Sequence, residues 1–376
     1  MSDSDADVIV VGAGIVGAAC ADACARAGLR VIVCEAAVIG GGATAAGMGH
    51  LTVMDDSEAQ FALTHRSLGL WHALAPALPA AAEYTRCGTI WVAADGEEME
   101  AAEAKHRYCA DRGVVTEMLD GPALARHEPH LRPGLAGGVR VPGDAICYSP
   151  VAAAWLLERS GARVRHAAVR AIGGGRVECA DGAVLRAPAI INACGADAAR
   201  LTPGLPIRPR KGHLVITDRY PGLVRHELVE LGYIKSAHSQ DGGDSVAFNV
   251  QPRATGQLLF GSSRQFDARD AAVDHAILAR MLRRCAAFMP ALDDLLAIRT
   301  WTGFRAATPD SLPLIGPWPG DASVWLATGH EGLGITTALG TAELIAHHLA
   351  GAPTGLPVAP YLPARFEGVA GHAHHH

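Results

Sequence analysis

Three glycines near the beginning of the chain have a spacing that suits the binding of a pyrophosphate. The motif Gly12-x-Gly14-x-x-Gly17 follows a short apolar run, residues 8–11, and opens a stretch of small residues that Gly28 closes. Gly12 permits a tight turn, Gly14 lets the backbone approach the phosphates, and Gly17 lets a helix lie close to the strand. The free N–H groups at the start of that helix attract phosphate. The pattern therefore predicts a strand, a phosphate-binding turn and a helix.

An acid follows the next apolar run at the distance that a ribose-binding residue needs. Residues 29–34 indicate a second buried strand, and Glu35 stands at its end, roughly 20 residues beyond the turn. A carboxylate there accepts hydrogen bonds from ribose hydroxyls and disfavours a 2′-phosphate, so FAD or NAD is favoured over NADP. A glycine motif by itself is weak support for a nucleotide, whereas strand, turn, helix and acid together match the whole motif.

A second run of small residues, 40–50, follows this acid. So many glycines and alanines have too little side chain to form a core, but they allow the backbone to lie against a large flat ligand. A flexible loop is the alternative interpretation. The position of the run, directly after the ribose-binding acid, favours a second contact with the cofactor.

Composition excludes several other classes of protein. The chain has 376 residues, nearly half of them apolar, and a net charge of −6, which predicts two α/β domains and no nucleic-acid surface. No apolar run reaches the roughly 18 residues of a membrane span, and the N-terminus lacks the layout of a signal peptide. The nine cysteines form no C-x-x-C pair, and Cys20 and Cys24 have a core-facing spacing. Free buried thiols and a cytoplasmic location are expected. No metal-binding spacing occurs in the body of the chain.

Hydrophobic periodicity and turn residues place the remaining elements. Helices are expected over residues 56–78, 97–112, 151–160 and 274–289, with Ser149 as the N-cap of the third, and a last helix ends at Leu349. Strands are expected over residues 89–93, 164–170, 176–179, 189–196, 213–217, 245–250, 257–261 and 324–328. A hairpin turn is expected at Asp181-Gly182, and the strands between residues 213 and 261 are expected to form an antiparallel sheet.

These motifs resemble those of a known family. Gly12 to Gly17, Glu35 and Gly42-Ala43-Thr44-x-x-Gly47-x-Gly49 are similar to the N-terminal signature of the FAD-dependent D-amino-acid oxidase superfamily, which includes glycine and sarcosine oxidases. Residues 301–316, which contain Arg305, resemble its C-terminal signature. Residues 45–51 particularly resemble the flavoprotein β subunits of D-hydroxyproline dehydrogenase, opine oxidase and hydrogen cyanide synthase.

The resemblance implies an α/β fold in which a Rossmann-like FAD-binding domain, a doubly wound parallel sheet, carries an inserted α+β substrate domain built on an antiparallel sheet. It assigns residues 1–80, 140–205 and 300–365 to the FAD-binding domain. Residues 81–139 and 206–299 form the substrate domain. Residues 366–376, which end in several histidines, are a tag or a disordered tail.

The resemblance also implies a set of contacts with FAD, held without a covalent bond. Val169 is expected to contact the adenine, and the glycine turn before the last helix is expected to face the flavin and stabilise its reduced, anionic form. The full set is Gly12, Gly14, Ile15, Val16, Gly17, Glu35, Ala36, Gly42, Ala43, Thr44, Gly47, Met48, Gly49, His50, Val169, Ala193, Gly195, Gly329, Gly332, Leu333, Gly334, Ile335 and Thr336.

The expected reaction is the oxidation of an amino acid or a secondary amino acid by hydride transfer from its α-carbon to flavin N5. Arg305 is expected to bind the substrate carboxylate, because its guanidinium offers paired donors and never loses its charge. His50 and His330 are the softer catalytic candidates, since each of them lines the flavin or merely satisfies a backbone carbonyl. Asn249 stands where many oxidases carry a tyrosine, so the roles of that tyrosine do not transfer.

The fate of the electrons stays open at this point. One alternative is a self-contained oxidase that uses oxygen. Another is a flavoprotein subunit whose electrons leave through an iron–sulfur or flavoprotein partner, which would also hold the chain peripherally at a membrane. Because the cysteines are not clustered, such an iron–sulfur cluster would lie on another polypeptide. A nicotinamide-dependent reductase and an inactive FAD-binding module are the remaining alternatives, and Arg305 argues against the second.

Overall fold

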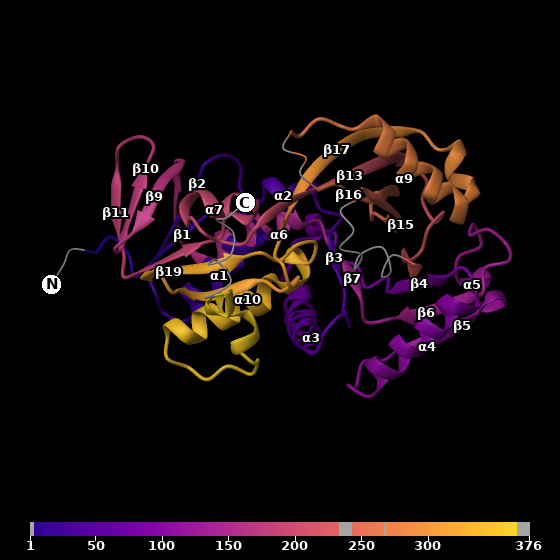
Figure 1. Ribbon diagram of the computed structural model, residues 1–376, viewed down its shortest axis with the longest axis horizontal. Coiled ribbons are helices and arrows are strands. Elements are labelled where there is room, and N and C mark those ends of the chain that lie inside the picture. Colours follow the sequence, from indigo (N-terminus) through magenta and orange to yellow (C-terminus); the bar gives the residue numbers. More distant parts are fainter. Residues whose placement is uncertain (1–3, 233–242, 267, 269, 367–376) are drawn as a thin grey trace, which may run out of the picture.

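The computed structural model describes residues 4–232, 243–266, 268 and 270–366. The predicted tail therefore lies, apart from Phe366, outside the described residues. Two sheets occupy opposite ends of an elongated molecule, and Figure 1 shows the helix α10 (Gly334–Leu349) under the first sheet and α9 (His275–Phe288) beside the second. The arrangement confirms the α/β fold that the sequence predicts.

A six-stranded sheet forms the end that carries the N-terminal glycine motif. Its strand order is β18-β19-β12-β1-β2-β8, and all neighbours are parallel except β18 and β19. Its strands are β1 (Val8–Val11), β2 (Val31–Glu35), β8 (Arg163–His166), β12 (Ala189–Asn192), β18 (Leu314–Trp318) and β19 (Asp321–Thr328). Helices α1 (Ile15–Arg26) and α10 cover one face, and α6 (Ser149–Ser160) and α3 (Glu58–Leu74) pack on α1 and α10 respectively.

Both faces of this sheet are buried, which explains the continuous apolar runs. Val8 and Val10 point into the core formed with the helices, whereas Ile9 and Val11 point into a second core. That second core is closed by a three-stranded antiparallel sheet made of β9 (Val169–Gly173), β10 (Arg176–Cys179) and β11 (Val184–Arg186). The predicted hairpin turn at Asp181-Gly182 joins β10 to β11.

An eight-stranded sheet forms the other end, in the order β17-β13-β16-β15-β14-β4-β6-β5. Its neighbours are antiparallel, as predicted for the strands between residues 213 and 261, except that β14 and β4 are parallel. Its strands are β4 (Thr89–Ala93), β5 (Glu117–Asp120), β6 (Gly137–Val141), β13 (Arg208–Arg219), β14 (Glu227–Glu230), β15 (Ser245–Pro252), β16 (Gln257–Arg264) and β17 (Ala297–Ala307).

Helix α9 packs on this sheet through an apolar face. Met281, Cys285 and Phe288 are buried, and the ring of Phe288 stacks on Phe248 of β15 with centroids 4.7 Å apart. The remaining short elements are α2 (Gly42–Ala46), β3 (His50–Leu51), α4 (Gly96–Ala110), α5 (Gly121–His127), β7 (Ala145–Ile146) and α7 (Ala198–Leu201). Of these, β3 and β7 pair with each other as a two-stranded sheet.

Three local expectations are corrected. The strand predicted over residues 164–170 is two strands, β8 and β9, because the chain changes sheet between them. Ser149 is not an N-cap: α6 begins at Ser149 itself, and its hydroxyl donates to the carbonyl of Thr44. The helix predicted to reach residue 78 ends at Leu74, where a 3-10 turn containing Pro76 follows. The predicted domain boundary at residue 300 falls inside β17, while the division into domains stays a prediction.

Candidate functional site

A cavity of about 1270 Å³ lies where the loops of the six-stranded sheet meet the eight-stranded sheet. Its walls include Gly12, Glu35, Ala193 and Gly329, which follow or end the parallel strands β1, β2, β12 and β19. Ligands of open α/β sheets bind at the carboxyl ends of the strands. The opposite wall is made by β15, β16 and β17, so one cavity brings both parts of the molecule together.

The structure brings nearly all of the predicted site residues to this one cavity. Those that line it are Arg305, His330, Gly12, Gly14, Ile15, Val16, Glu35, Ala36, Gly42, Ala43, Thr44, Gly47, Met48, Gly49, His50, Val169, Ala193, Gly195, Gly329, Gly332, Gly334 and Ile335. Gly17, Leu333 and Thr336 lie behind the wall. A Cβ on Gly17 would stand 2.0 Å from the carbonyl oxygen of Gly12, so this glycine allows α1 to lie on β1, as predicted. The hydroxyl of Thr336 donates to the carbonyl of His50 over 2.9 Å.

The turn after β1 has the geometry that a phosphate site needs. Gly12 has a φ of +102°, and a Cβ there would stand 2.8 Å from the carbonyl oxygen of Ala193. Gly14 is the N-cap of α1, and the next N–H, that of Ile15, donates to the hydroxyl of Thr44 over 3.0 Å. Apart from the Thr44 hydroxyl, the glycines keep the approach to the first turn of α1 open, where the helix dipole favours anions.

Glu35 connects this turn to the loop that follows β2. One carboxylate oxygen accepts from the N–H of Ala13 over 2.7 Å, and the other accepts from the N–H of Ala37 over 2.8 Å. A carboxylate has about four acceptor positions, so a ribose hydroxyl can still donate to Glu35. The acid has a structural role that the sequence did not reveal, while its binding of a ribose stays a prediction. The cavity, the glycine turn and this acid fit a dinucleotide such as FAD.

Comparison with known proteins agrees with this geometry. The family described as DAO, FAD dependent oxidoreductase, matches residues 7–348 of the chain. The chain belongs to this family. Its cofactor is therefore FAD, and the choice that the glycine motif left open between FAD and NAD is settled.

Several relatives match the chain, two of them over nearly its full length. Glycine oxidase of Geobacillus kaustophilus is 26% identical over 97% of this chain and 98% of that protein. Hydrogen cyanide synthase subunit HcnC of Pseudomonas aeruginosa is 25% identical over 96% of each chain. D-amino acid dehydrogenase of Methylobacterium nodulans is 32% identical over 64% of this chain and 58% of its own. The crystal structure of the Geobacillus glycine oxidase superposes with a TM-score of 0.85 at 26% identity, covering 96% of this chain and 98% of that chain.

Arg305 enters the cavity from β17. Its Nη1 donates to the backbone carbonyl of Ser263 over 2.9 Å. The guanidinium lies directly on the backbone of Gly212, where a Cβ would stand 2.6 Å from Nη1, and the side chain also passes Gly332, where a Cβ would stand 3.6 Å from Nε. Gly212 thus leaves the room that the guanidinium occupies, whereas a Cβ at Gly332 would make only an ordinary van der Waals contact.

His50 is oriented by an acid that sequence reasoning missed. Its Nδ1 lies 3.0 Å from Oε1 of Glu227, whose other oxygen accepts from the hydroxyl of Thr89 over 3.3 Å. Glu227 begins β14, far from His50 along the chain, and nothing in its sequence context indicates this contact. Nε2 of His50 is buried and has no hydrogen-bond partner among the described residues. The imidazole is therefore held by a carboxylate, not by a backbone carbonyl.

A second buried acid, Asp144, lies close to this pair. It is fully buried, one oxygen accepts from the N–H of Val53 over 3.2 Å, and the other has no hydrogen-bond partner in the described part of the chain. Burial, together with the nearby charge of Glu227, raises the pKa of Asp144 to about 8. At neutral pH the protonated form of this carboxyl group therefore predominates.

His330 lies in the glycine turn after β19, directly after Gly329, and lines the cavity. Its Nε2 lies 2.9 Å from the hydroxyl of Thr341 on α10. Complete burial lowers the pKa of His330 to about 3. The imidazole is thus neutral throughout the physiological range and adds no positive charge to the cavity. A positioning contact with α10 is the role that the geometry supports.

Two residues of the eight-stranded sheet that line the cavity carry a buried acceptor atom without a partner among the described residues. Oδ1 of Asn249 on β15 and Oγ of Ser262 on β16 are buried and make no hydrogen bond within the described residues, and both residues line the cavity. Leaving such a group unpaired costs about 1–3 kcal/mol. A bound molecule that donates hydrogen bonds would recover this cost.

The other predicted features concern thiols, metals and membranes. The nine cysteines are free, and most of them are buried, as expected. Among the described residues, no three histidine, cysteine or acidic side chains are placed to hold a metal ion. In the same part of the chain, none of the helices combines the length and the apolar character of a membrane span.

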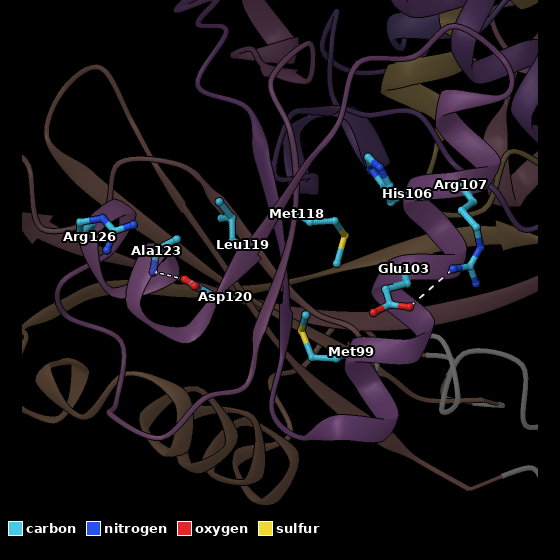
Figure 2. A pocket seen from close by; sticks show the side chains of 9 residues that line it. All are labelled: Met99, Glu103, His106, Arg107, Met118, Leu119, Asp120, Ala123 and Arg126. Carbon is cyan, nitrogen blue, oxygen red and sulfur yellow. Dashed lines mark hydrogen bonds and ion pairs between the residues drawn. The ribbon is translucent and has the colours of Figure 1, made fainter.

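A second, smaller hollow of about 580 Å³ lies between α4, β5 and α5. Figure 2 shows two interactions among the side chains that line it: Glu103 pairs with Arg107, and Asp120 accepts from the N–H of Ala123. None of the predicted site residues lies there. The hollow has no unpaired buried polar atom among the described residues, and we assign it no ligand.

Replacing Glu35 with alanine is expected to weaken FAD binding. A hydrogen bond to a charged acceptor contributes about 1.5–3 kcal/mol, which corresponds to an increase in Kd of roughly 10- to 150-fold. Titrating the apoprotein with FAD and following the quenching of flavin fluorescence measures this Kd. Glu178→Ala, which removes an exposed carboxylate of β10, is the control. An unchanged Kd in Glu35→Ala would place the ribose contact elsewhere.

Replacing Asp144 with asparagine is expected to change how stability depends on pH. The pKa of Asp144 is raised from 3.8 to about 8 in the folded protein, so between these values the folded chain holds a proton that the unfolded chain has lost. The free energy of unfolding of the wild type therefore falls with rising pH in this window, by at most about 1.4 kcal/mol per pH unit. Asparagine removes this contribution.

The Tm of Asp144→Asn, relative to the wild type, should accordingly rise from pH 5 to pH 8 and level off above pH 8. Differential scanning fluorimetry across this range measures the difference. Asp111→Asn, on the exposed end of α4, should show no such trend. A constant difference between Asp144→Asn and wild type would show that Asp144 is ionised in the folded protein.

Proposed function

We propose that the protein oxidises an amino acid or a secondary amino acid, transferring hydride from the α-carbon to flavin N5. FAD, when bound, supplies the ring that accepts the hydride. The observation that carries the proposal is the placement of Arg305 in the wall of the cavity that also contains the glycine turn. One cavity thus combines a dinucleotide site with a fixed cation for a carboxylate.

Arg305 is suited to bind the carboxylate of such a substrate. A guanidinium binds a carboxylate through two parallel N–H donors and keeps its charge at every physiological pH. The bond from Nη1 to Ser263 fixes the plane of the group, and Gly212 leaves space for it. A carboxylate held there would have a defined orientation, which hydride transfer requires.

The unpaired acceptors supply a site for the amine. Substrate N–H groups could donate to Oδ1 of Asn249 and to Oγ of Ser262, both of which are buried in the wall. A carboxylate-binding cation and two amine-binding acceptors in one cavity match the two polar groups of an amino acid. The similarity of the chain to a glycine oxidase and to a D-amino acid dehydrogenase supports this substrate class.

Secondary amino acids are the substrates that we favour within this class, including D-hydroxyproline, proline derivatives and N-substituted amino acids. The support is the resemblance of residues 45–51 to the β subunits of D-hydroxyproline dehydrogenase and opine oxidase. An anaerobic screen that follows the bleaching of the flavin tests this choice directly. It should include glycine, sarcosine, both enantiomers of proline, hydroxyproline and D-alanine. Failure of every compound to reduce the flavin would contradict the proposed function.

We also propose that the electrons leave to a partner subunit in the cytoplasm or at the membrane surface. The name of HcnC, a subunit of a larger enzyme, supports this arrangement. Reduction of an artificial dye is therefore expected to be fast during turnover, and consumption of oxygen is expected to be slow. An oxygen electrode and a dye assay on the same sample measure the two rates. Stoichiometric formation of peroxide at the rate of flavin reduction would instead identify a self-contained oxidase.

Arg305→Ala is expected to lower kcat/KM by roughly 30-fold to several thousandfold, because removing one partner of a desolvated charge pair costs about 2–5 kcal/mol. Most of the loss should appear in KM, with a part in kcat because the α-carbon is no longer held in place. Arg305→Lys should recover only part of the activity, since an ammonium group keeps the charge and lacks the paired donors.

FAD content and Tm of the Arg305 variants should stay near those of the wild type. Loss of FAD or of the folded state in Arg305→Ala would indicate a structural role for the guanidinium. A fully active Arg305→Ala variant would show that the substrate carboxylate binds elsewhere.

A further inference from the structure

We propose that His213 and Ser263 are positioning residues that fix the guanidinium of Arg305 for binding a substrate carboxylate. This inference rests on the proposed function of Arg305. Neither residue lines the cavity, and both are about 1% exposed. They act through the hydrogen bonds that connect them to Arg305, and not through contact with the substrate.

Ser263 is the centre of this arrangement. Its Oγ accepts from the backbone N–H of His213 over 2.9 Å and lies 2.9 Å from Nδ1 of the same histidine. Its backbone carbonyl accepts from Nη1 of Arg305 over 2.9 Å. The side chain of Ser263 on β16 is thus held by His213 of β13. The backbone carbonyl of Ser263 in turn holds Arg305 of β17.

The tautomer of His213 follows from its second nitrogen. The backbone N–H of Asp274 points at Nε2 over 2.9 Å, so Nε2 must be an acceptor. A neutral imidazole then carries its proton on Nδ1, and that proton is directed at Oγ of Ser263. The direction of this donation requires the neutral form, because a protonated Nε2 would face the N–H of Asp274.

The surroundings keep His213 in that form. Burial lowers the pKa of His213, and the positive charge of Lys211 lowers it further; Arg305 acts in the same direction, while Asp274 and Asp244 oppose it. Asp274 is also the N-cap of α9, where its side chain accepts from the N–H groups of Ala276 and Ile277. The imidazole is therefore anchored to the rigid start of a helix.

The position of Arg305 depends on the anchoring of His213, because only the backbone of a glycine lies beneath the guanidinium. The guanidinium lies on Gly212, the residue before His213. A shift of His213 would therefore move both the surface on which Arg305 lies and the carbonyl to which Nη1 donates. A clamp that must hold a carboxylate with two N–H donors tolerates little rotation.

His213→Leu removes both hydrogen bonds of the imidazole and tests the inference. The KM for the amino acid that reduces the flavin fastest is expected to rise at least tenfold, while kcat changes less than threefold. The Kd of 2-methylalanine, which has an amine and a carboxylate but no α-hydrogen to transfer, should rise by the same factor. This Kd is read from the perturbation of the flavin spectrum without turnover.

His213→Asn keeps a donor near the position of Nδ1 and should recover a substantial part of the affinity. Ser263→Ala and Gly212→Ala test the same route without removing the imidazole. The first should raise Kd about threefold to tenfold. The second should raise it more, because the new Cβ would stand 2.6 Å from Nη1 of Arg305. His226→Asn, which changes a buried histidine paired with Glu128 away from the cavity, is the matched control and should leave Kd unchanged.

A double variant at His213 and Arg305 distinguishes failure of the positioning role from failure of the proposed function. In the Arg305→Lys background, His213→Leu should have little further effect, because the guanidinium that it positions is already absent. Additive effects, or an unchanged Kd in His213→Leu and Gly212→Ala, would overturn the positioning role while leaving that of Arg305 intact. A fully active Arg305→Ala variant would overturn the proposed function itself. If His213→Leu fails to fold, Ser263→Ala and Gly212→Ala decide the question by the same readout.

Discussion

The close approach of α1 to β1 is the constraint on which the rest of the structure depends. A Cβ on Gly17 would stand 2.0 Å from the carbonyl oxygen of Gly12, so no other residue allows the helix to lie at this distance. The approach aims the N-terminus of α1 at the cavity. It also presents the other faces of α1 to α6 and α10, which share its core. The glycine turn after β1 and the glycine turn after β19 are consequently parts of one packed unit.

The two parts of the molecule are joined at the residues that would touch the substrate. Strand β17 belongs to the eight-stranded sheet, yet the carbonyl of Ala306 near its end accepts from the N–H of Glu331 in the glycine turn after β19. Arg210 of the neighbouring strand β13 also pairs with Glu331. Arg305 therefore lies directly beside the connection between the two sheets, and this arginine and the glycine turn after β19 are placed relative to each other by backbone and ionic contacts.

The sequence was sufficient to predict the features that depend on neighbouring residues in the chain. The glycine turn, the acid after the second strand and the arginine of the C-terminal signature each follow from spacing or from a motif, and their residues meet in one cavity. The contacts between distant segments could not be predicted. Nothing near Glu227 indicates that it orients His50, and nothing near His213 indicates that it reaches Arg305 through Ser263. The two strands β8 and β9 were predicted as one because periodicity does not reveal a change of sheet.

The walls of the cavity come from segments that extend from residue 11 to residue 335. A ligand bound there holds the first strand, the middle of the chain and the last helix together, and it binds only the folded chain. Such a ligand raises the free energy of unfolding in proportion to the logarithm of its free concentration. The resistance of this protein to proteolysis inside a cell should therefore follow the supply of riboflavin, and its abundance should report on flavin status before any substrate is present.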